Sequence, residues 1–196
     1  MKNRRLVAIA VSLAIFGTAS AVEVRAETAA QLQDSCSQAL LKLEIMQKDS
    51  KGSLRLKEKA KRYEFITFVN DMMCYEPAGE TDKTKPAFKD ITSKHRAYNE
   101  IRTAAANNII EAYKDGTIKP DRIITYSEAL QMVLKALGYS GQIKDLDAKG
   151  IVQRSGELGL IADAAIAPEK QITRGEASII IYNALTVDFA DVPRGE

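Results

Sequence analysis

The chain has 196 residues, of which 28 are Lys or Arg and 26 are Asp or Glu, so its formal charge is +2. Residues 1–26 are typical of a signal peptide: a basic start, an apolar run too short to span a membrane, and a small-residue cleavage site. Removing them takes away four basic residues and one acidic residue and leaves a formal charge of −1. A nearly neutral mature chain argues against a general nucleic-acid or anionic-membrane binder, which carries an excess of Lys and Arg. We therefore expect an exported protein with no membrane span after cleavage and enough residues for one compact domain.

Residues 27–76 are expected to form the first of three helical units. Apolar residues on one face predict a helix over 29–47, and a second helix follows over 62–75. We expect these two helices to pack against each other. Cys36 and Cys74 lie one in each helix, and an even pair in an exported protein favours a disulfide; the alternative is two small buried hydrophobic residues.

A polar linker over residues 77–87, with two prolines, separates the first unit from a second unit over 88–140. This second unit opens with a predicted helix over 95–110. The dipeptide Asp115-Gly116 then marks a turn, in which Gly tolerates a positive φ. Gly138 is placed to end the unit's last helix.

The third unit covers residues 141–187. Its first helix is predicted over 148–157, and its last helix runs from Arg174 to about Thr186. Residues 188–196 are expected to be a poorly ordered tail.

The last helix begins with a capping box. Thr173 is followed three residues later by Glu176, and apolar residues then recur at helical spacing. The Thr hydroxyl is expected to accept a hydrogen bond from the Glu amide, and the Glu side chain to accept one from the Thr amide. Two amides of the first turn are thereby satisfied.

The same helix start recurs twice. Residues 124–137 repeat the box with Thr125 and Glu128, and residues 61–73 keep Glu64 but place Lys61 where the Thr stood. Three related helix starts in one chain indicate an internal repeat.

Arg174 occupies the first helical position after the cap, where a cation is mildly disfavoured by the helix dipole. An anion held jointly by its guanidinium and the free amides of the first turn explains this placement. Arg62 holds the same position in the first unit and Tyr126 in the second. The alternative is that each Arg pairs with an acidic side chain of the neighbouring unit.

These helix starts resemble the S-layer homology domain family, whose helix-opening signature is Ile-Thr-Arg-Ala-Glu and which usually comes as three tandem repeats. The second unit carries more of the pattern, with Phe-Lys-Asp-Ile at 88–91, the helix over 95–110 and the turn over 114–121. The resemblance implies an all-α fold of three helix-loop-helix repeats packed as a pseudo-threefold bundle.

In that family each signature Arg faces a groove between repeats and binds an acidic group, typically a pyruvyl ketal. The resemblance therefore implies non-covalent anchoring to a secondary cell-wall polysaccharide or peptidoglycan-linked glycan, at the cell wall or in the S-layer, with protein cargo as a further partner. The residues it assigns to ligand binding are Arg174, Arg62, Thr173, Tyr126, Lys61, Asp115, Gly116 and Arg96.

Two of these positions depart from the family pattern. Tyr126 cannot act as the cation, so the second groove is either inactive or works by sugar stacking and a hydroxyl hydrogen bond. Arg96 stands where the family commonly has Trp, and it is either a solvated substitution or a replacement cation near the groove.

No catalytic constellation emerges from the sequence. His95 is the single histidine, and two Cys with one His give no zinc spacing. We expect no enzyme activity, no metal and no cofactor. The main alternative to the anchor is a secreted helical adaptor whose degenerate grooves bind a protein partner.

Overall fold

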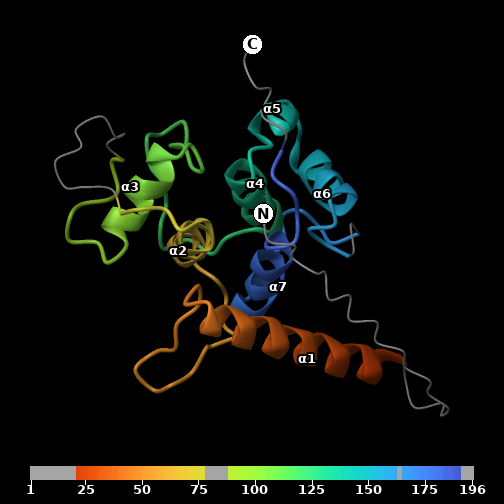
Figure 1. Ribbon diagram of the computed structural model, residues 1–196. Helices are drawn as coiled ribbons and strands as arrows, with labels where there is room; N and C mark the ends of the chain where they lie inside the picture. The colour runs from red at the N-terminus through yellow and green to blue at the C-terminus, as the bar shows by residue number, and fades with distance from the viewer. Residues whose placement is uncertain (1–20, 78–87, 163–164, 191–196) are drawn as a thin grey trace, which may run out of the picture.

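The computed structural model describes residues 21–77, 88–162 and 165–190, and in this part of the chain every regular element is a helix. The all-α class is therefore confirmed. None of the helices in the described ranges has the length and apolarity needed to cross a membrane. The helices of these residues, labelled in Figure 1, are α1 Ala21–Lys42, α2 Arg62–Met73, α3 Tyr98–Ala106, α4 Tyr126–Ala136, α5 Ser140–Ile143, α6 Ala148–Glu157 and α7 Arg174–Ala184.

The predicted capping box at α7 is confirmed in full. The hydroxyl of Thr173 accepts a hydrogen bond from the amide of Glu176 (3.1 Å), and the Glu176 carboxylate accepts one from the amide of Thr173 (2.7 Å). At α4 the carboxylate of Glu128 accepts from the amide of Thr125 (3.0 Å). Each contact satisfies an amide that the helix itself leaves without a partner.

The segments before α2, α4 and α7 meet in a closed ring of backbone hydrogen bonds. The amide of Ala60 donates to the carbonyl of Ile172 (3.0 Å), that of Ile124 to Ala60 (3.0 Å), and that of Ile172 to Ile124 (3.3 Å). All three residues are fully buried. The ring ties the three related helix starts together at one point of the core, while the pseudo-threefold packing of the whole bundle stays a prediction.

The helices pair differently from the sequence expectation. Helix α1 packs mainly against α7, α2 against α3, and α4 against α6. The expected packing of the first helix against the second is therefore wrong: α1 crosses α7, the last helix of the described residues, and extends past it (Figure 1). The first and last helices of the described residues are thus packing partners.

Helix α1 also ends at Lys42, before the predicted end at residue 47. The chain reverses there through Glu44, whose φ is 62°, and the amides of Ile45 and Met46 both donate to the carbonyl of Leu40. Both apolar side chains are buried as a result. Leu43, which the apolar spacing placed on the buried face of a longer helix, is exposed at this turn.

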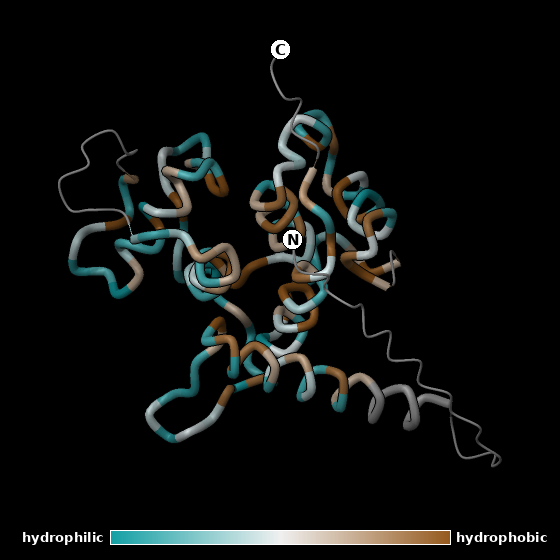
Figure 2. Tube along the Cα trace, viewed as in Figure 1, coloured by the Kyte–Doolittle hydropathy of each residue, from teal (hydrophilic) through white to brown (hydrophobic). Residues whose placement is uncertain are grey.

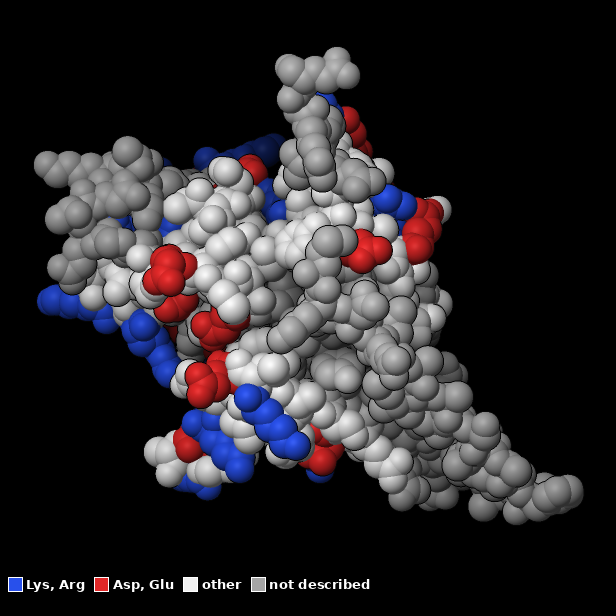
Figure 3. All heavy atoms as spheres, viewed as in Figure 1, with Lys and Arg blue, Asp and Glu red and all other residues white. Residues whose placement is uncertain are grey.

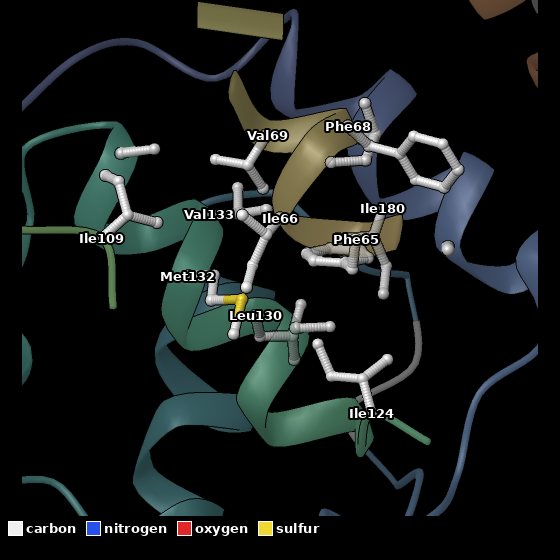
Figure 4. Packing of buried hydrophobic residues seen from close by; sticks show 14 of the residues in the cluster. Phe65, Ile66, Phe68, Val69, Ile109, Ile124, Leu130, Met132, Val133 and Ile180 are labelled. Atoms are coloured by element: carbon white, nitrogen blue, oxygen red, sulfur yellow. The ribbon is translucent and has the colours of Figure 1, made fainter. Parts of the chain in front are cut away.

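The core lies where α2, α4 and α7 meet. Apolar side chains from all three helices form one cluster, among them Phe65, Leu130 and Ile180 (Figure 4). Figure 2 shows hydrophobic residues concentrated in this central region. Each fully buried aromatic or aliphatic side chain contributes about 1.5–3 kcal/mol to the folded state, so this cluster fixes the relative positions of the three helix starts.

The expected disulfide is not formed. Cys36 is buried on α1, whereas Cys74 is exposed at the end of α2, and both are free thiols. Because α1 packs against α7, the two cysteines belong to helices that are not packing partners. Burial raises the pKa of the Cys36 thiol, which behaves as a small buried hydrophobic residue.

Four further expectations are resolved by the structure. Helix α3 is shorter than predicted at both ends, and α6 has the predicted bounds. The segment 188–190 is not a loose tail, because the amide of Ala190 donates to the carbonyl of Leu137 (2.9 Å). Gly138 follows α4 with a φ of 90°, as its predicted role at the helix end requires.

Some predicted features lie outside the described residues. They are most of the signal peptide, nearly all of the linker after the first unit, and residues 191–196.

Candidate functional site

A groove with a volume of about 740 Å³ lies between the segment after α1, helix α2, the start of α3 and the start of α7. Cations and acids line it in equal number. The cations are Lys48, Arg55, Arg96 and Arg174, and the acids are Asp49, Glu64, Asp71 and Glu100. Two of the residues predicted from the sequence, Arg174 and Arg96, thus line the same groove.

Arg174 forms part of the groove floor and is held in place by its neighbours. Its side chain is only 4% exposed, and Nη1 lies 2.7 Å from Oε1 of Glu64 on α2. Its Nε donates to the carbonyl of Leu54 (3.0 Å), and the guanidinium lies over the ring of Phe68 at 5.2 Å. Burial lowers the pKa of Arg174, but an arginine stays charged in proteins. The pairing expected as the alternative to ligand binding is therefore present, in a residue that also faces the groove.

Arg55 places a second guanidinium on the same carboxylate. Its Nη2 donates to Oε1 of Glu64 (2.7 Å), and its Nη1 donates to Glu58 (3.1 Å). Buried Arg55 Nε makes no hydrogen bond within the described residues. Arg55 Nε also lies 3.9 Å from the Asp49 carboxylate, so three acids, Asp49, Glu58 and Glu64, lie beside the guanidiniums of Arg55 and Arg174. Sequence reasoning missed Arg55, because it lies in a loop outside every motif and reaches the groove through a backbone with a φ of 53°.

The amides at the start of α7 are not available to an anion. The amide of Arg174 donates to the carbonyl of Glu58 (2.8 Å), and that of Gly175 donates to Leu56 (2.9 Å). The expectation that free helix amides hold an anion together with the guanidinium is therefore wrong. Carbonyls of the preceding loop occupy these donors, so an anion in this groove is contacted by side chains.

Arg62 occupies a different and more enclosed environment. It is 5% exposed, its Nε donates to the carbonyl of Ile118 (3.1 Å), and Nη1 lies 3.5 Å from Glu128 of α4. The ring of Tyr113 covers the guanidinium at 5.1 Å, and Arg122 pairs with the same Glu128 carboxylate. Arg62 thus repeats the contact of Arg174 with Glu64 but does not line the groove described above.

The remaining predicted residues also lie away from this groove. Tyr126 is buried at the start of α4, and Thr173 serves the capping box of α7. Lys61 pairs with Asp121 at 2.8 Å. Asp115 and Gly116 form the predicted turn: Gly116 has a φ of 80°, and the Asp115 carboxylate accepts hydrogen bonds from Thr117, which lower its pKa to about 2.

Arg96 lies on the groove wall at the start of α3. Its side chain is exposed, and its guanidinium lies over the ring of Tyr63 at 5.3 Å. The wall also carries Asp71 and Glu100. Burial, followed by the nearby charge of Glu100, raises the pKa of Asp71 to about 6. The charge of the groove therefore changes near neutral pH.

Both signs of charge are mixed on the surface around these residues. Figure 3 shows Lys and Arg beside Asp and Glu over the segment that follows α1, at the lower left of the view. Within the described residues, no group of three or more His, Cys, Asp or Glu side chains is placed to hold a metal ion.

A comparison with known proteins finds a family that matches part of the chain. Residues 87–130, which span α3, the turn at Gly116 and the start of α4, match the family model of the S-layer homology domain. The whole chain is 32% identical over 205 residues to a "Cell surface protein" of Thermoanaerobacter kivui, of which it spans 26%.

Two further relatives carry names of the same kind. A "Middle cell wall protein" of Brevibacillus brevis is 26% identical over 190 residues, covering 95% of this chain and 18% of the relative. A "Cellulosome-anchoring protein" of Acetivibrio thermocellus is 28% identical over 130 residues, covering 54% of this chain and 29% of the relative. The chain thus spans less than a third of the length of each of these relatives.

Proposed function

This chain is a member of the S-layer homology domain family through its residues 87–130, and from that premise we propose that it anchors non-covalently to the bacterial cell wall. The groove that contains Arg174 binds an acidic, pyruvylated group of a secondary cell-wall polysaccharide. The protein acts at the cell surface after export through its predicted signal peptide. Relatives named for cell-surface, cell-wall and anchoring roles support this reading, and their names describe no catalytic activity.

The observation that carries the proposal is a cluster of arginine side chains in one open groove, with Arg55 and Arg174 at its floor and Arg96 on its wall. Two guanidiniums, from Arg55 and Arg174, share the one carboxylate of Glu64, each at 2.7 Å. A guanidinium presents parallel donors that match a carboxylate, so these arginines suit an acidic sugar substituent. Because both guanidiniums are at most about one third exposed, water and salt screen this attraction less than at an open surface.

Arg96 supplies the accessible contact. Its exposed guanidinium stands on the groove wall, held by the ring of Tyr63, whereas Arg174 is fixed at the floor. A charged hydrogen bond contributes about 1.5–3 kcal/mol, so loss of this side chain is expected to weaken binding about tenfold or more.

The test is cosedimentation of the mature protein with purified wall sacculi, before and after mild acid removal of ketal-linked pyruvate. The variant Arg96→Ala probes the groove without disturbing the core. The matched control is Arg154→Ala on α6, because Arg154 is also partly exposed and paired only with nearby side chains outside the groove. Circular dichroism and melting temperature verify that both variants fold.

Binding that falls after pyruvate removal and in Arg96→Ala, but not in Arg154→Ala, supports the anchor and its groove. Equal binding of all three proteins to untreated walls moves the contact elsewhere on the surface. A protein that does not bind walls under any condition rejects the anchor and favours the adaptor, whose apolar contact with a protein partner would be much less sensitive to salt.

A further inference from the structure

A second hollow adjoins the groove on the other side of Arg96. Its volume is about 610 Å³, and it is lined by residues of the first turns of α3 and of the segment before them. Arg96 and Glu100 line both hollows. Either volume falls within the ~300–1,000 Å³ typical of ligand sites in proteins. The two hollows therefore meet at Arg96 and Glu100.

The second hollow has the more positive lining. Its fixed charges are Arg96 and Arg102 against Glu100, whereas the first groove balances its cations with as many acids. Arg102 is only 8% exposed yet lines the hollow, and its guanidinium lies over the ring of Tyr98 at 5.4 Å. Neutral hydrogen-bonding groups of Ser93 and Asn99 complete the lining. This combination of cations and neutral donors suits a second acidic sugar.

We propose that the two hollows bind one polysaccharide strand that carries acidic groups on at least two sugar residues, with Arg96 at the junction between them. This inference rests on the proposed function and specifies its ligand. A glycan with a single acidic end group would fill one hollow, whereas a repeating acidic polymer fills both. The ligand is therefore an internal stretch of chain, not a lone terminal sugar.

Occupying two linked sites raises affinity without any new kind of contact. Once one acidic sugar is bound, the next is held near the second hollow at an effective concentration of about millimolar. The affinity should consequently rise with the length of the fragment. A negative charge added to the second hollow alone should lower the affinity for the longer fragments.

The variant Asn99→Asp places a carboxylate in the second hollow. Asn99 is exposed and lies in the first turn of α3, where a negative charge is compatible with the helix dipole, so the fold should be retained. The control is Gln131→Glu, which adds the same charge at an exposed position of α4 that lines neither hollow. The probes are polysaccharide fragments released from purified walls and sized into single acidic sugars and longer stretches. Their dissociation constants are measured by titration calorimetry.

For the unmodified chain we expect the longer fragments to bind at least tenfold more tightly than the single acidic sugar. Asn99→Asp should weaken the longer fragments more than the single acidic sugar, which the first groove still binds, while Gln131→Glu changes neither. Equal affinity for all lengths, or an unchanged preference in Asn99→Asp, overturns the two-site inference while the anchor stands. If no fragment of any length binds the unmodified chain, the proposed function falls and this inference with it.

Discussion

Arg174 Nη1 and Glu64 Oε1 lie 2.7 Å apart although the two residues are separated by 110 positions in the chain. Arg174 is the first residue of α7, and Glu64 is the third residue of α2, which also caps that helix by accepting from the amide of Lys61 (3.0 Å). The related pair Arg62 and Glu128 connects α2 to α4 in the same way. Arg62 and Arg174 therefore both connect the starts of two helices through an ion pair. Of the two, Arg174 alone lines the open groove.

Replacing Glu64 by Gln should destabilise the protein strongly. The change keeps the size of the side chain but leaves two guanidiniums, of Arg55 and Arg174, without their shared negative charge. Breaking a buried ion pair in this way costs about 3–5 kcal/mol, and urea unfolding measures the change. The control is Glu58→Gln, whose side chain is 59% exposed and pairs with Arg55 alone, so its cost should stay below about 1 kcal/mol. A loss for Glu64→Gln as small as that of the control would contradict the structural role given to this carboxylate.

Arg62 and Arg96 should separate stability from binding. Arg62→Met removes the hydrogen bond to the buried carbonyl of Ile118, and we expect a loss of about 1–3 kcal/mol in the free energy of unfolding. Binding to wall sacculi should be unchanged well below the melting temperature. Arg96→Ala should show the reverse, with weaker binding and nearly unchanged stability. Loss of wall binding in folded Arg62→Met would place a ligand contact at this enclosed position.

The helix starts were predictable from the sequence because a capping box is a local signal. Thr173 and Glu176 are three residues apart, and their hydrogen bonds depend on no other part of the chain. The role of Arg174 was not predictable in the same way. Its partner Glu64 and the groove around it arise from packing between distant segments, which local spacing does not reveal.

The positions of Arg55 and α1 were also not predictable from local spacing. Arg55 enters the groove through a loop with positive φ, and no residue pattern around it indicates that conformation. Of the apolar residues predicted to share one face of α1, Cys36 and Leu40 are buried but Leu32 and Leu43 are exposed, and the pattern does not say that α7 is the partner. The predicted disulfide between Cys36 and Cys74 assumed that α1 packs against α2. Because α1 packs against α7 instead, that prediction was wrong.

Gly175 should not tolerate a side chain. A Cβ at this position would lie 3.1 Å from the carbonyl oxygen of Leu56 and would also collide with the side chain of Gln33 on α1. The Gln side chain is able to move, but the Leu56 carbonyl accepts the Gly175 hydrogen bond and is held in place. We expect Gly175→Ala to lower stability by about 1–3 kcal/mol, as overpacking does.

Gly141 gives the matched control, because a Cβ there meets nothing within 4 Å. Gly141→Ala should be neutral or slightly stabilising in the same thermal unfolding experiment. Equal melting temperatures for the two variants would show that α1 and the loop at Leu56 yield to the extra methyl group.

The two cysteines should differ in reactivity. Cys74 is exposed, whereas Cys36 is 2% exposed and its raised pKa disfavours the reactive thiolate. A thiol reagent should therefore label one cysteine in the folded protein and both after unfolding without reductant. Cys74→Ser should abolish labelling of the folded protein. If neither cysteine is labelled, folded or unfolded, until reductant is added, the cysteines are bonded and the assignment as free thiols fails.

Binding of an acidic glycan should strengthen as the pH falls through about 6. The pKa of Asp71 is raised to about 6, mainly by burial and then by Glu100, so this carboxyl is charged at pH 7.5 and largely neutral at pH 5. Losing a negative charge makes the groove more positive, and the affinity for a strongly acidic sugar rises.

The raised pKa of Asp71 also affects the free energy of unfolding. Because the folded state holds the proton more tightly than the unfolded state, the shift stabilises the folded protein at low pH. The contribution is complete below the unfolded value, near 3.8, and is lost as the pH rises through about 6. Asp71→Asn mimics the neutral form at every pH. The variant should therefore bind as tightly at pH 7.5 as at pH 5. Its stability relative to the unmodified chain should rise progressively between about pH 3.8 and 6 and stay at the full gain above about pH 6. Titration calorimetry and urea unfolding at both pH values measure these differences. An equal pH dependence of binding in the unmodified chain and in Asp71→Asn would assign the titration to another group.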